Sequence, residues 1–332
     1  MNNKNLVLGC QTFGKQISES NAFQILDYSL EHGIKKFDLA ERYPFPESRN
    51  SVGLTEKIFG NWMNSRKTRD KVFLSTKVTG RNESGWFGKN GSRLTTERIN
   101  EAIKRSIKRL NVDDVDLFFL HWPDRYTNNF GRNFYNPEPD FEYIPIEDQY
   151  LGLVKAQKEG LIKYYGVANE SAWGVMKFIE QGRSKNNFPY LQEPFSLLDR
   201  KIEIYLSEII MREKLQLQVH SIISGGLLSG KYKFDKNNLI SGEGRLTRFL
   251  HETRKFKRRL IIDKYLKIEN FCKDNNLSIV ELAIIYPFSK KFISDVIIGV
   301  SSLEQLKMIL KIVNNPLNFE TVNELEKLIW SS

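Results

Sequence analysis

Short apolar runs alternate along the chain with longer stretches of helical periodicity. Several runs are almost continuously apolar, which is typical of parallel strands buried on both faces. Between two of them, Ile99, Ile103, Ile107 and Leu110 recur at spacings of three and four among lysines and arginines, so that helix has one apolar face. We predict strands over residues 6–10, 34–40, 72–78, 115–121, 162–169, 191–196, 217–223 and 295–300. Helices are predicted over 20–32, 54–65, 96–110, 146–159, 172–181, 201–214, 260–274, 278–286, 304–313 and 320–330.

This order of strands and helices predicts an α/β fold, a closed (β/α)8 TIM barrel formed by residues 1–332 as a single domain. An open doubly wound sheet is the alternative, but no G-x-G-x-x-G turn follows the first predicted strand. Two long connections, 122–145 and 224–259, both follow strands. In a barrel they lie on the C-terminal face, where active sites of this fold are found.

Composition narrows the class of protein. The chain has 332 residues, of which 40% are hydrophobic, so a large core is expected rather than disorder. Lys and Arg (50) exceed Asp and Glu (40) by 50 − 40 = 10, which favours anionic ligands. The two cysteines, Cys10 and Cys272, exclude a disulfide framework and fit a reducing compartment. Every apolar run is shorter than the roughly 20 residues of a membrane span, so we expect a cytoplasmic protein without membrane association.

Polar side chains end three consecutive predicted strands. Asp38, Lys77 and His121 lie at the ends of the second, third and fourth strands, and Tyr43 follows Asp38 by five residues. A buried ammonium beside a tyrosine lowers the pKa of the phenol, and a carboxylate keeps that ammonium charged. A histidine can orient a substrate carbonyl. We therefore interpret Tyr43 as proton donor, Lys77 as the group that tunes it, Asp38 as the partner of Lys77, and His121 as the orienting group.

A carbonyl held in this way can accept hydride, which no side chain supplies, so the set calls for a nicotinamide. Taken singly, each residue has a structural explanation, since strand-end Lys and His are usually solvated and Asp often caps a helix. Only the combination carries the hypothesis. A Schiff-base aldolase with Lys77 as nucleophile is an alternative, although a neighbouring Asp38 would raise the pKa of Lys77 rather than lower it. We expect no metal site.

The motifs around these residues follow one another in a specific order. They are Gly53-Leu54-Thr55-Glu56, Ser75-Thr76-Lys77-Val78, His121-Trp122-Pro123 and Gly166-Val167-Ala168-Asn169-Glu170. Over nearly its whole length the sequence resembles the aldo-keto reductases, which are (β/α)8 barrels with an Asp–Tyr–Lys–His tetrad. The resemblance implies an NAD(P)H-dependent oxidoreductase that reduces an aldehyde or ketone, such as a sugar-like carbonyl, to an alcohol. The alternative is a nucleotide-binding regulatory module with little turnover, like relatives that accompany ion channels.

The resemblance also implies where the cofactor binds. Asn169 and Gln192 correspond to contacts of the nicotinamide carboxamide, and His220, followed by Ser221, takes the place of a stacking aromatic residue. The remaining positions are Gly226, Leu228, Gly230 and Lys231 along the pyrophosphate, Gly299, Ser301 and Gln305 at the adenosine phosphate, and Arg248 on a loop over the cofactor. NADP(H) is expected, and NAD(H) stays open because Ser302 replaces a frequent arginine.

Two loops bear on the partners of the protein. The loop 122–145 contributes the aromatic residues Trp122, Tyr126, Phe130, Phe134, Tyr135 and Tyr143, and we expect Trp122, Asp124 and Arg125 to contact a small carbonyl substrate. The basic segment 245–259 has few aromatic residues, so we expect no nucleic-acid partner. The oligomeric state stays open.

Overall fold

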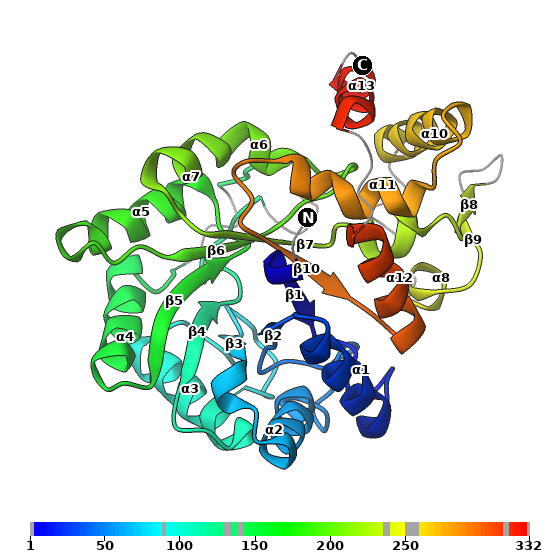
Figure 1. The fold of residues 1–332 in the computed structure, drawn as a ribbon. Coiled ribbons are helices and arrows are strands. Elements are labelled where there is room, and N and C mark those ends of the chain that lie inside the picture. The colour runs from blue at the N-terminus through cyan, green and yellow to red at the C-terminus, as the bar shows by residue number, and fades with distance from the viewer. Residues whose placement is uncertain are drawn as a thin grey trace.

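The strands close into a barrel in the computed structural model, which describes residues 3–87, 91–128, 134–137, 142–234, 240–249, 259–314 and 319–330. The barrel strands are β1 (Leu6–Gly9), β2 (Lys36–Asp38), β3 (Phe73–Val78), β4 (Val115–Leu120), β5 (Ile162–Ala168), β6 (Tyr190–Pro194), β7 (Leu217–His220) and β10 (Asp295–Gly299). All pair in parallel, in the closed order β1-β10-β7-β6-β5-β4-β3-β2 (Figure 1). The predicted (β/α)8 barrel is confirmed.

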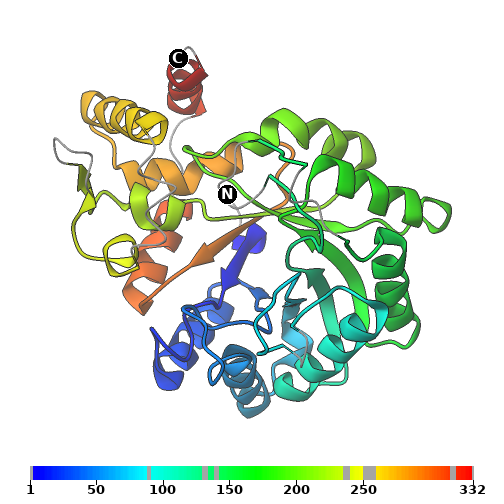
Figure 2. The ribbon, with the colours of Figure 1, turned by 180° about the vertical axis from the view of Figure 1, so that it is seen from behind.

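Helices surround the barrel on its outer side (Figures 1 and 2). They are α1 (Glu19–Glu31), α2 (Leu54–Arg66), α3 (Thr96–Leu110), α4 (Ile146–Lys158), α5 (Ala172–Gly182), α6 (Lys201–Tyr205), α7 (Ser207–Glu213), α11 (Ile279–Ile285) and α12 (Leu303–Asn314), with short 3-10 turns η1 (Asn3–Asn5), η2 (Arg69–Lys71), η3 (Arg183–Lys185), η4 (Ser224–Ser229) and η6 (Tyr286–Ser289). The helix predicted over 201–214 is two helices, because Leu206 has a φ of −119°, far from the helical value of about −63°.

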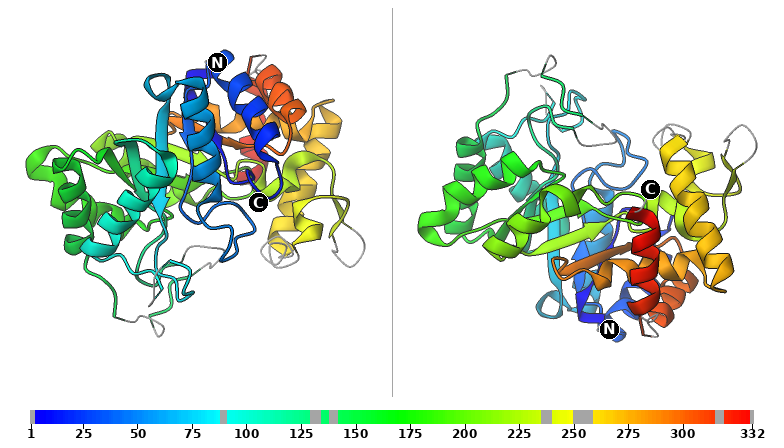
Figure 3. Two further views of the ribbon diagram at one scale, coloured as in Figure 1. Left: turned by 90° about the horizontal axis from the view of Figure 1, so that it is seen from below. Right: turned by 90° about the horizontal axis from the view of Figure 1, so that it is seen from above.

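The long connection after β7 carries further structure. It contains an antiparallel ribbon of β8 (Lys233–Phe234) and β9 (Ile240–Ser241), then α8 (Arg245–Arg248) and α10 (Arg259–Asp274). This ribbon and the loop after β4 project from the same side of the barrel (Figure 3). In the described part of the chain, no helix is long and apolar enough to cross a membrane.

Alternating side chains of the strands fill the barrel and its outer layer. On β4, Leu117 and Phe119 pack in a cluster inside the barrel, whereas Phe118 and Leu120 belong to the core under the helices. At the end of the barrel where the strands begin, Lys36 of β2 pairs with Asp295 of β10 at 2.6 Å. The barrel interior is therefore a packed core rather than a pore.

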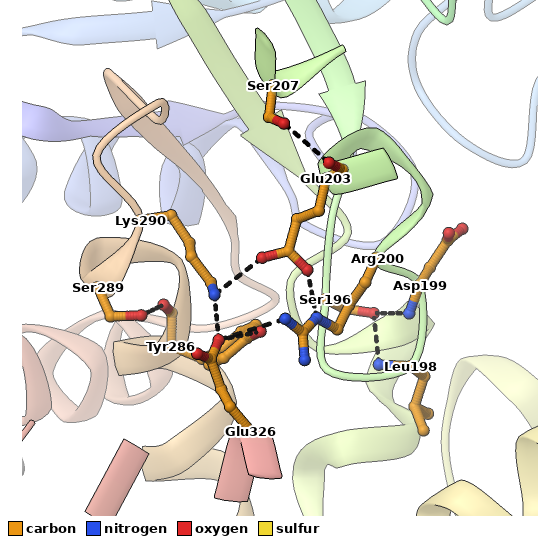
Figure 4. Close-up of polar contacts among 10 residues, drawn as sticks. All are labelled: Ser196, Leu198, Asp199, Arg200, Glu203, Ser207, Tyr286, Ser289, Lys290 and Glu326. Carbon is orange, nitrogen blue, oxygen red and sulfur yellow. Dashed lines mark hydrogen bonds and ion pairs between the residues drawn. The ribbon is translucent and has the colours of Figure 1, made fainter. Parts of the chain in front are cut away.

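The last helix, α13 (Phe319–Trp330), packs against α10 and is attached to the barrel by charged side chains (Figure 4). Glu326 accepts hydrogen bonds from Tyr286 Oη at 2.9 Å, from Arg200 Nη2 at 3.3 Å and from Lys290. Lys290 also pairs with Glu203 at 2.8 Å. Arg200 precedes α6, so this charged cluster connects α13 to the segment that follows β6.

Candidate active site

The ends of β2 and β3 bring two opposite charges together in the barrel interior. Lys77 Nζ donates to Asp38 Oδ2 at 2.6 Å and to the carbonyl of Leu39 at 2.7 Å. The exposed fractions of the two side chains are 0% for Lys77 and 4% for Asp38. Burial lowers the pKa of Lys77, and the charge of Asp38 opposes that shift. The predicted pairing of Lys77 with Asp38 is confirmed.

The second oxygen of Asp38 is held by neutral donors. Ser75 Oγ donates to Asp38 Oδ1 at 3.0 Å, and Gln192 Nε2 donates to the same oxygen at 2.9 Å. Gln192 Nε2 also lies 3.2 Å from Gln218 Oε1. The amide nitrogen of Gln192 is thus directed at this buried carboxylate, and the ion pair is fixed from three strands.

Tyr43 lies in the loop between β2 and α2, close to both Lys77 and His121. Lys77 Nζ is 5.4 Å from the centroid of the Tyr43 ring, and the Tyr43 and His121 rings meet edge to face with centroids 5.8 Å apart. Burial and the charge of Asp38 raise the pKa of Tyr43 far above its ordinary value. The predicted net lowering of the Tyr43 pKa is therefore wrong, because burial of the ring and the charge of Asp38 dominate.

His121 directly follows β4, and its imidazole is held in the neutral form. Burial, then the charges of Lys77 and Arg42, lower the pKa of His121 well below its usual value. Its Nδ1 is buried and makes no hydrogen bond within the described part of the chain. A neutral imidazole keeps one N–H donor, which suits the orientation of a carbonyl oxygen.

A cavity of about 1440 Å³ opens at this end of the barrel. It exceeds the roughly 300–1,000 Å³ of typical small-molecule pockets, so it has room for a large ligand and a second, smaller one. Most of the predicted residues line it: Asp38, Tyr43, His121, Trp122, Asn169, Gln192, His220, Ser221, Gly226, Lys231, Arg248, Gly299, Ser301 and Gln305. Lys77, Leu228, Gly230, Asp124 and Arg125 do not line it.

The arc of the cavity after β7 and β10 has features that fit a nucleotide. Gly225 and Gly226 have φ of 66° and 99°, values that favour glycine, and they let the backbone itself form the wall. At Gly299 an added Cβ would find no protein atom within 4 Å, so a side chain there would occupy cavity space. The cations along this arc are Lys231, Arg245 and Arg248, and two acids, Asp199 and Glu243, also line the cavity.

Several predicted cofactor contacts already have partners in the protein. Ser301 N–H donates to Gln305 Oε1 at 2.8 Å, and Gln305 N–H donates to Ser302 Oγ at 3.2 Å. Asn169 Nδ2 donates to the carbonyl of His121 at 2.9 Å, which ties the end of β5 to the end of β4. His220 Nδ1 lies 2.9 Å from Ser221 Oγ. These bonds fix the polar wall of the cavity before any ligand binds.

Asp124 has a structural position rather than a place in the cavity. Its carboxylate accepts hydrogen bonds from Arg93 Nη2 at 2.7 Å, from the Leu94 N–H at 2.8 Å and from the Ile144 N–H at 3.1 Å. The side chain of Asp124 is fully buried. The expected contact of Asp124 with substrate is corrected: it holds the two ends of the loop after β4 against the segment before α3.

Arg125 is also engaged away from the cavity. It pairs with Glu170, donates to Ser171 Oγ at 2.9 Å, and lies 4.8 Å over the Trp173 ring. Its expected substrate role is therefore corrected as well. Of the aromatic residues expected from the loop 122–145, Trp122 lines the cavity, whereas Phe134 is 84% exposed, and Phe130 lies outside the described residues. Residues 250–258 of the basic segment also lie outside them.

Sequence reasoning missed some lining residues. Gln11, Thr12 and Lys15 follow β1, and Arg42 and Arg245 come from the loops after β2 and β7. The rule that pointed to Asp38, polar residues at the end of a strand, also applies to Gln11 and Thr12. Arg42 has no such signal, because its direction depends on how the loop folds.

A buried ion pair supports the loop that carries Tyr43. Arg98 Nη2 donates to both oxygens of Glu41, at 2.7 and 2.8 Å, and the Thr79 N–H donates to Glu41 Oε1 at 2.6 Å. Arg98 is oriented by the N-cap of α3, where Thr95 Oγ1 accepts from the Arg98 N–H at 3.2 Å. Glu41, two residues before Tyr43, is therefore fixed by α3 and by the residue that follows β3.

Comparison with known proteins agrees with this geometry. The family model "Aldo/keto reductase family" matches residues 5–329. "Protein tas" of Escherichia coli (strain K12) is 32% identical over 331 residues, covering 97% of this chain and 92% of the relative. "Uncharacterized oxidoreductase YrpG" of Bacillus subtilis (strain 168) is 29% identical over 332 residues, covering 97% and 91%. The "Aldo-keto reductase" of Babesia bovis is 29% identical over 253 residues, covering 71% and 87%.

The resemblance of the sequence to this family, and to its Tas-like branch, is thus confirmed. Three of the four tetrad positions, Asp38, Tyr43 and His121, line one cavity, and Lys77 is buried against Asp38. The chain belongs to the aldo/keto reductase family and is an oxidoreductase of that family.

Proposed function

We propose that the protein reduces an aldehyde or ketone to an alcohol with a reduced nicotinamide nucleotide, and that Tyr43 donates the proton. The observation that carries this proposal is the buried ion pair of Lys77 with Asp38, which lines the cavity, next to a phenol and a neutral imidazole. The protonated phenol and the neutral imidazole are the forms that such a reduction requires.

Tyr43 is in the form that can donate a proton. Because burial and Asp38 raise its pKa, the phenol stays protonated at neutral pH. Negative charge develops on the carbonyl oxygen during reduction, and the Tyr43 hydroxyl donates its proton to that oxygen. The phenolate left behind is stabilised by the Lys77 ammonium, which lies 5.4 Å from the ring centroid. His121 donates a hydrogen bond from its neutral ring and orients the carbonyl.

A bound nicotinamide would supply the hydride. Members of this family generally use nicotinamide cofactors, and the cavity fits one in volume and in its glycine-lined wall. Asn169, Gln192 and His220 would hold the nicotinamide end, and Ser221, Gly226, Lys231, Arg248, Gly299, Ser301 and Gln305 the rest of the nucleotide. Leu228 is buried in the core beneath this wall. Gly230, with a φ of 79°, ends the η4 turn, so these two residues shape the wall rather than contact the cofactor.

We further propose a preference for NADPH over NADH. Lys231, Arg245 and Arg248 place three cations on the arc of the cavity that fits the nucleotide, and an additional phosphate gains from such a field. Substrate is then a small carbonyl compound held on the opposite arc, between Tyr43, His121 and Trp122.

The aldolase alternative is not favoured by the position of Lys77. Although burial lowers the pKa of Lys77, its Nζ is enclosed by Asp38 and the carbonyl of Leu39, and Lys77 does not line the cavity. A Schiff base requires the amine to reach the substrate carbonyl.

Fluorescence titration with NADPH and NADH tests the cofactor proposal. We expect saturable quenching with both and tighter binding of NADPH. Arg248→Gln should weaken NADPH binding roughly 5- to 10-fold, as for loss of one charge-assisted contact. Arg212→Gln, on the outer face of α7 with 77% of its side chain exposed, serves as the matched control and should leave both affinities unchanged. If neither NADPH nor NADH bound, the proposed function would be contradicted.

A further inference from the structure

Arg42 lies on the substrate arc of the cavity, next to the groups assigned to the reaction. Its guanidinium carbon is 4.8 Å from the centroid of the Trp122 ring. The Trp122 ring lies 5.1 Å from that of His121, and His121 lies 5.8 Å from Tyr43, measured between centroids. All four side chains line the same cavity. A ligand with its carbonyl between Tyr43 and His121 therefore has the Arg42 cation beside it.

The surface that carries Arg42 is rigid. Trp122 Nε1 donates to the carbonyl of Arg81 at 3.0 Å. The neighbouring atom Cδ1 of the same five-membered ring is packed on Gly80, where an added Cβ would come within 2.5 Å of it. Because the indole is fixed, the guanidinium that rests on it is held in place before a ligand arrives, and less entropy is lost on binding.

Arg42 keeps binding capacity toward the cavity. Its side chain is 26% exposed, and its hydrogen-bond partner among the described residues is Glu47, which it contacts through Nη2. A guanidinium has five N–H donors. Glu47 does not line the cavity, whereas Arg42 does. The remaining donors are therefore those that a ligand in the cavity can meet.

The charge of Arg42 also reaches the reacting groups. After burial and Lys77, it contributes to the lowered pKa of His121, and it opposes the rise in the pKa of Tyr43 that burial and Asp38 cause. Arg42 differs from the proposed nucleotide cations in its contact with Trp122 after β4. Arg245 and Arg248 come from α8 after β7, and Arg245 lies 4.2 Å over the Phe45 ring.

We propose that Arg42 binds a carboxylate of the substrate, so that the preferred substrates are carbonyl compounds that carry an acid group; this inference rests on the proposed carbonyl reduction. One guanidinium, partly neutralised by Glu47, matches a monoanionic carboxylate better than a dianionic phosphate, and its planar fork suits bidentate binding of a carboxylate. Glu47 then competes with the substrate for Arg42.

A pair of substrates that differ in this charge tests the inference. Reduction of 4-formylbenzoate is compared with reduction of its methyl ester, by kcat/KM with NADPH. The wild type should prefer the acid, and Arg42→Gln should lower the acid-to-ester ratio at least about tenfold, the effect of losing a charge-assisted hydrogen bond. Arg42→Lys should retain part of the preference. Glu47→Gln should raise the ratio, because the competing carboxylate is removed.

Arg49 provides a matched control in the same loop, since it is exposed and does not line the cavity. Arg49→Gln removes the same charge and should leave the ratio unchanged. The inference would be overturned if the acid-to-ester ratio of kcat/KM were the same in the wild type, Arg42→Gln and Glu47→Gln. It would also be overturned if Arg42→Gln lowered kcat/KM equally for the acid and the ester.

Binding of non-reacting ligands separates this inference from the proposed function. Calorimetric titration of the NADP⁺-loaded protein with benzoate and benzamide needs no turnover. Benzoate should bind more tightly, and Arg42→Gln should weaken benzoate much more than benzamide. The carboxylate site would be refuted, and the proposed reduction kept, if the protein reduced the ester but preferred neither the acid over the ester nor benzoate over benzamide. Failure to reduce either aldehyde would instead refute the proposed reduction, and the substrate assignment with it.

Discussion

Lys77 and Asp38 form an ion pair of 2.6 Å in the barrel interior, and Gln192 holds the other oxygen of Asp38 at 2.9 Å. The pair serves two purposes at once. It places a cation near the Tyr43 ring, and it makes that cation tolerable inside the protein, because each charge is compensated by the other. Stability and the proposed chemistry therefore depend on the same contact.

Breaking the pair on one side should be costly. Asp38→Asn and Lys77→Met should each lower the free energy of unfolding by about 3–5 kcal/mol, because either one leaves a buried charge without its partner. The double variant should be less destabilised than the sum of the two single variants, since both charges are then gone. Urea unfolding measures the free energy of unfolding of the wild type, the two single variants and the double variant. Strict additivity would mean that the two charges are not coupled.

The dependence of kcat/KM on pH should have a broad plateau. Burial lowers the pKa of His121 below 6.5, so His121 gains its proton only as the pH falls below that value. Burial raises the pKa of Tyr43 above 10.0, so the phenol loses its proton only at higher pH. Neither group should titrate between these limits in the free enzyme. A limb of the profile with its midpoint near pH 8, abolished in Tyr43→Phe, would contradict the assigned states.

Asp124 should matter for stability rather than for the ligand. Asp124→Asn removes the charge partner of Arg93 and weakens the hydrogen bonds from two backbone N–H groups. The free energy of unfolding should therefore fall by about 2–4 kcal/mol. The dissociation constant of NADPH should stay within about twofold of the wild type. Asp113→Asn, an exposed neighbour of β4, should change neither quantity. A large loss of NADPH affinity with an unchanged free energy of unfolding would show that Asp124 acts in ligand binding instead.

Attachment of α13 through Glu326 should depend on pH. Burial alone would raise the pKa of Glu326, but Lys290, Tyr286 and Arg200 lower it below the ordinary 4.5. The stability that the ionised Glu326 carboxylate contributes is therefore fully present above pH 4.5. It is lost as the pH falls through the lower pKa that Glu326 has in the folded protein. Glu326→Gln should cost about 1–2 kcal/mol at pH 7, allowing for partial solvent screening.

The cost of Glu326→Gln should shrink at acidic pH, where the wild-type carboxyl is itself protonated. Thermal unfolding of both proteins from neutral to acidic pH measures this convergence. If the stability difference between the wild type and Glu326→Gln stayed the same down to the most acidic pH, packing rather than charge would hold α13 in place.

The sequence predicted the barrel well because its signals are local. Apolar runs such as 115–121 and stripes such as 96–110 carry the periodicity of strand and helix, and strand ends place Asp38, Lys77 and His121 together. The roles of Asp124 and Arg125 could not be read in this way, since their partners Arg93, Ile144 and Glu170 lie far along the chain.

The pKa of Tyr43 escaped prediction for a related reason. Its direction depends on how deeply the ring is buried and on where the Lys77 ammonium points, and neither is encoded near Tyr43. The ribbon β8–β9 was missed because strands of two residues have no measurable period. Arg42 and Glu326 likewise acquire their positions only from the folded loop and the docked helix.

Consumption of NADPH in the presence of an aldehyde, compared between the wild type and Tyr43→Phe, tests the proposed function most directly. Titration of both proteins with NADPH, by the fluorescence assay above, confirms that the cofactor site is intact. Removing the hydroxyl leaves the ring and its packing, so NADPH affinity should stay within about twofold while kcat falls by roughly 10²–10⁴-fold. An undiminished rate in Tyr43→Phe would contradict its role as proton donor, and tight NADPH binding without turnover of any carbonyl by the wild type would contradict the proposed reduction.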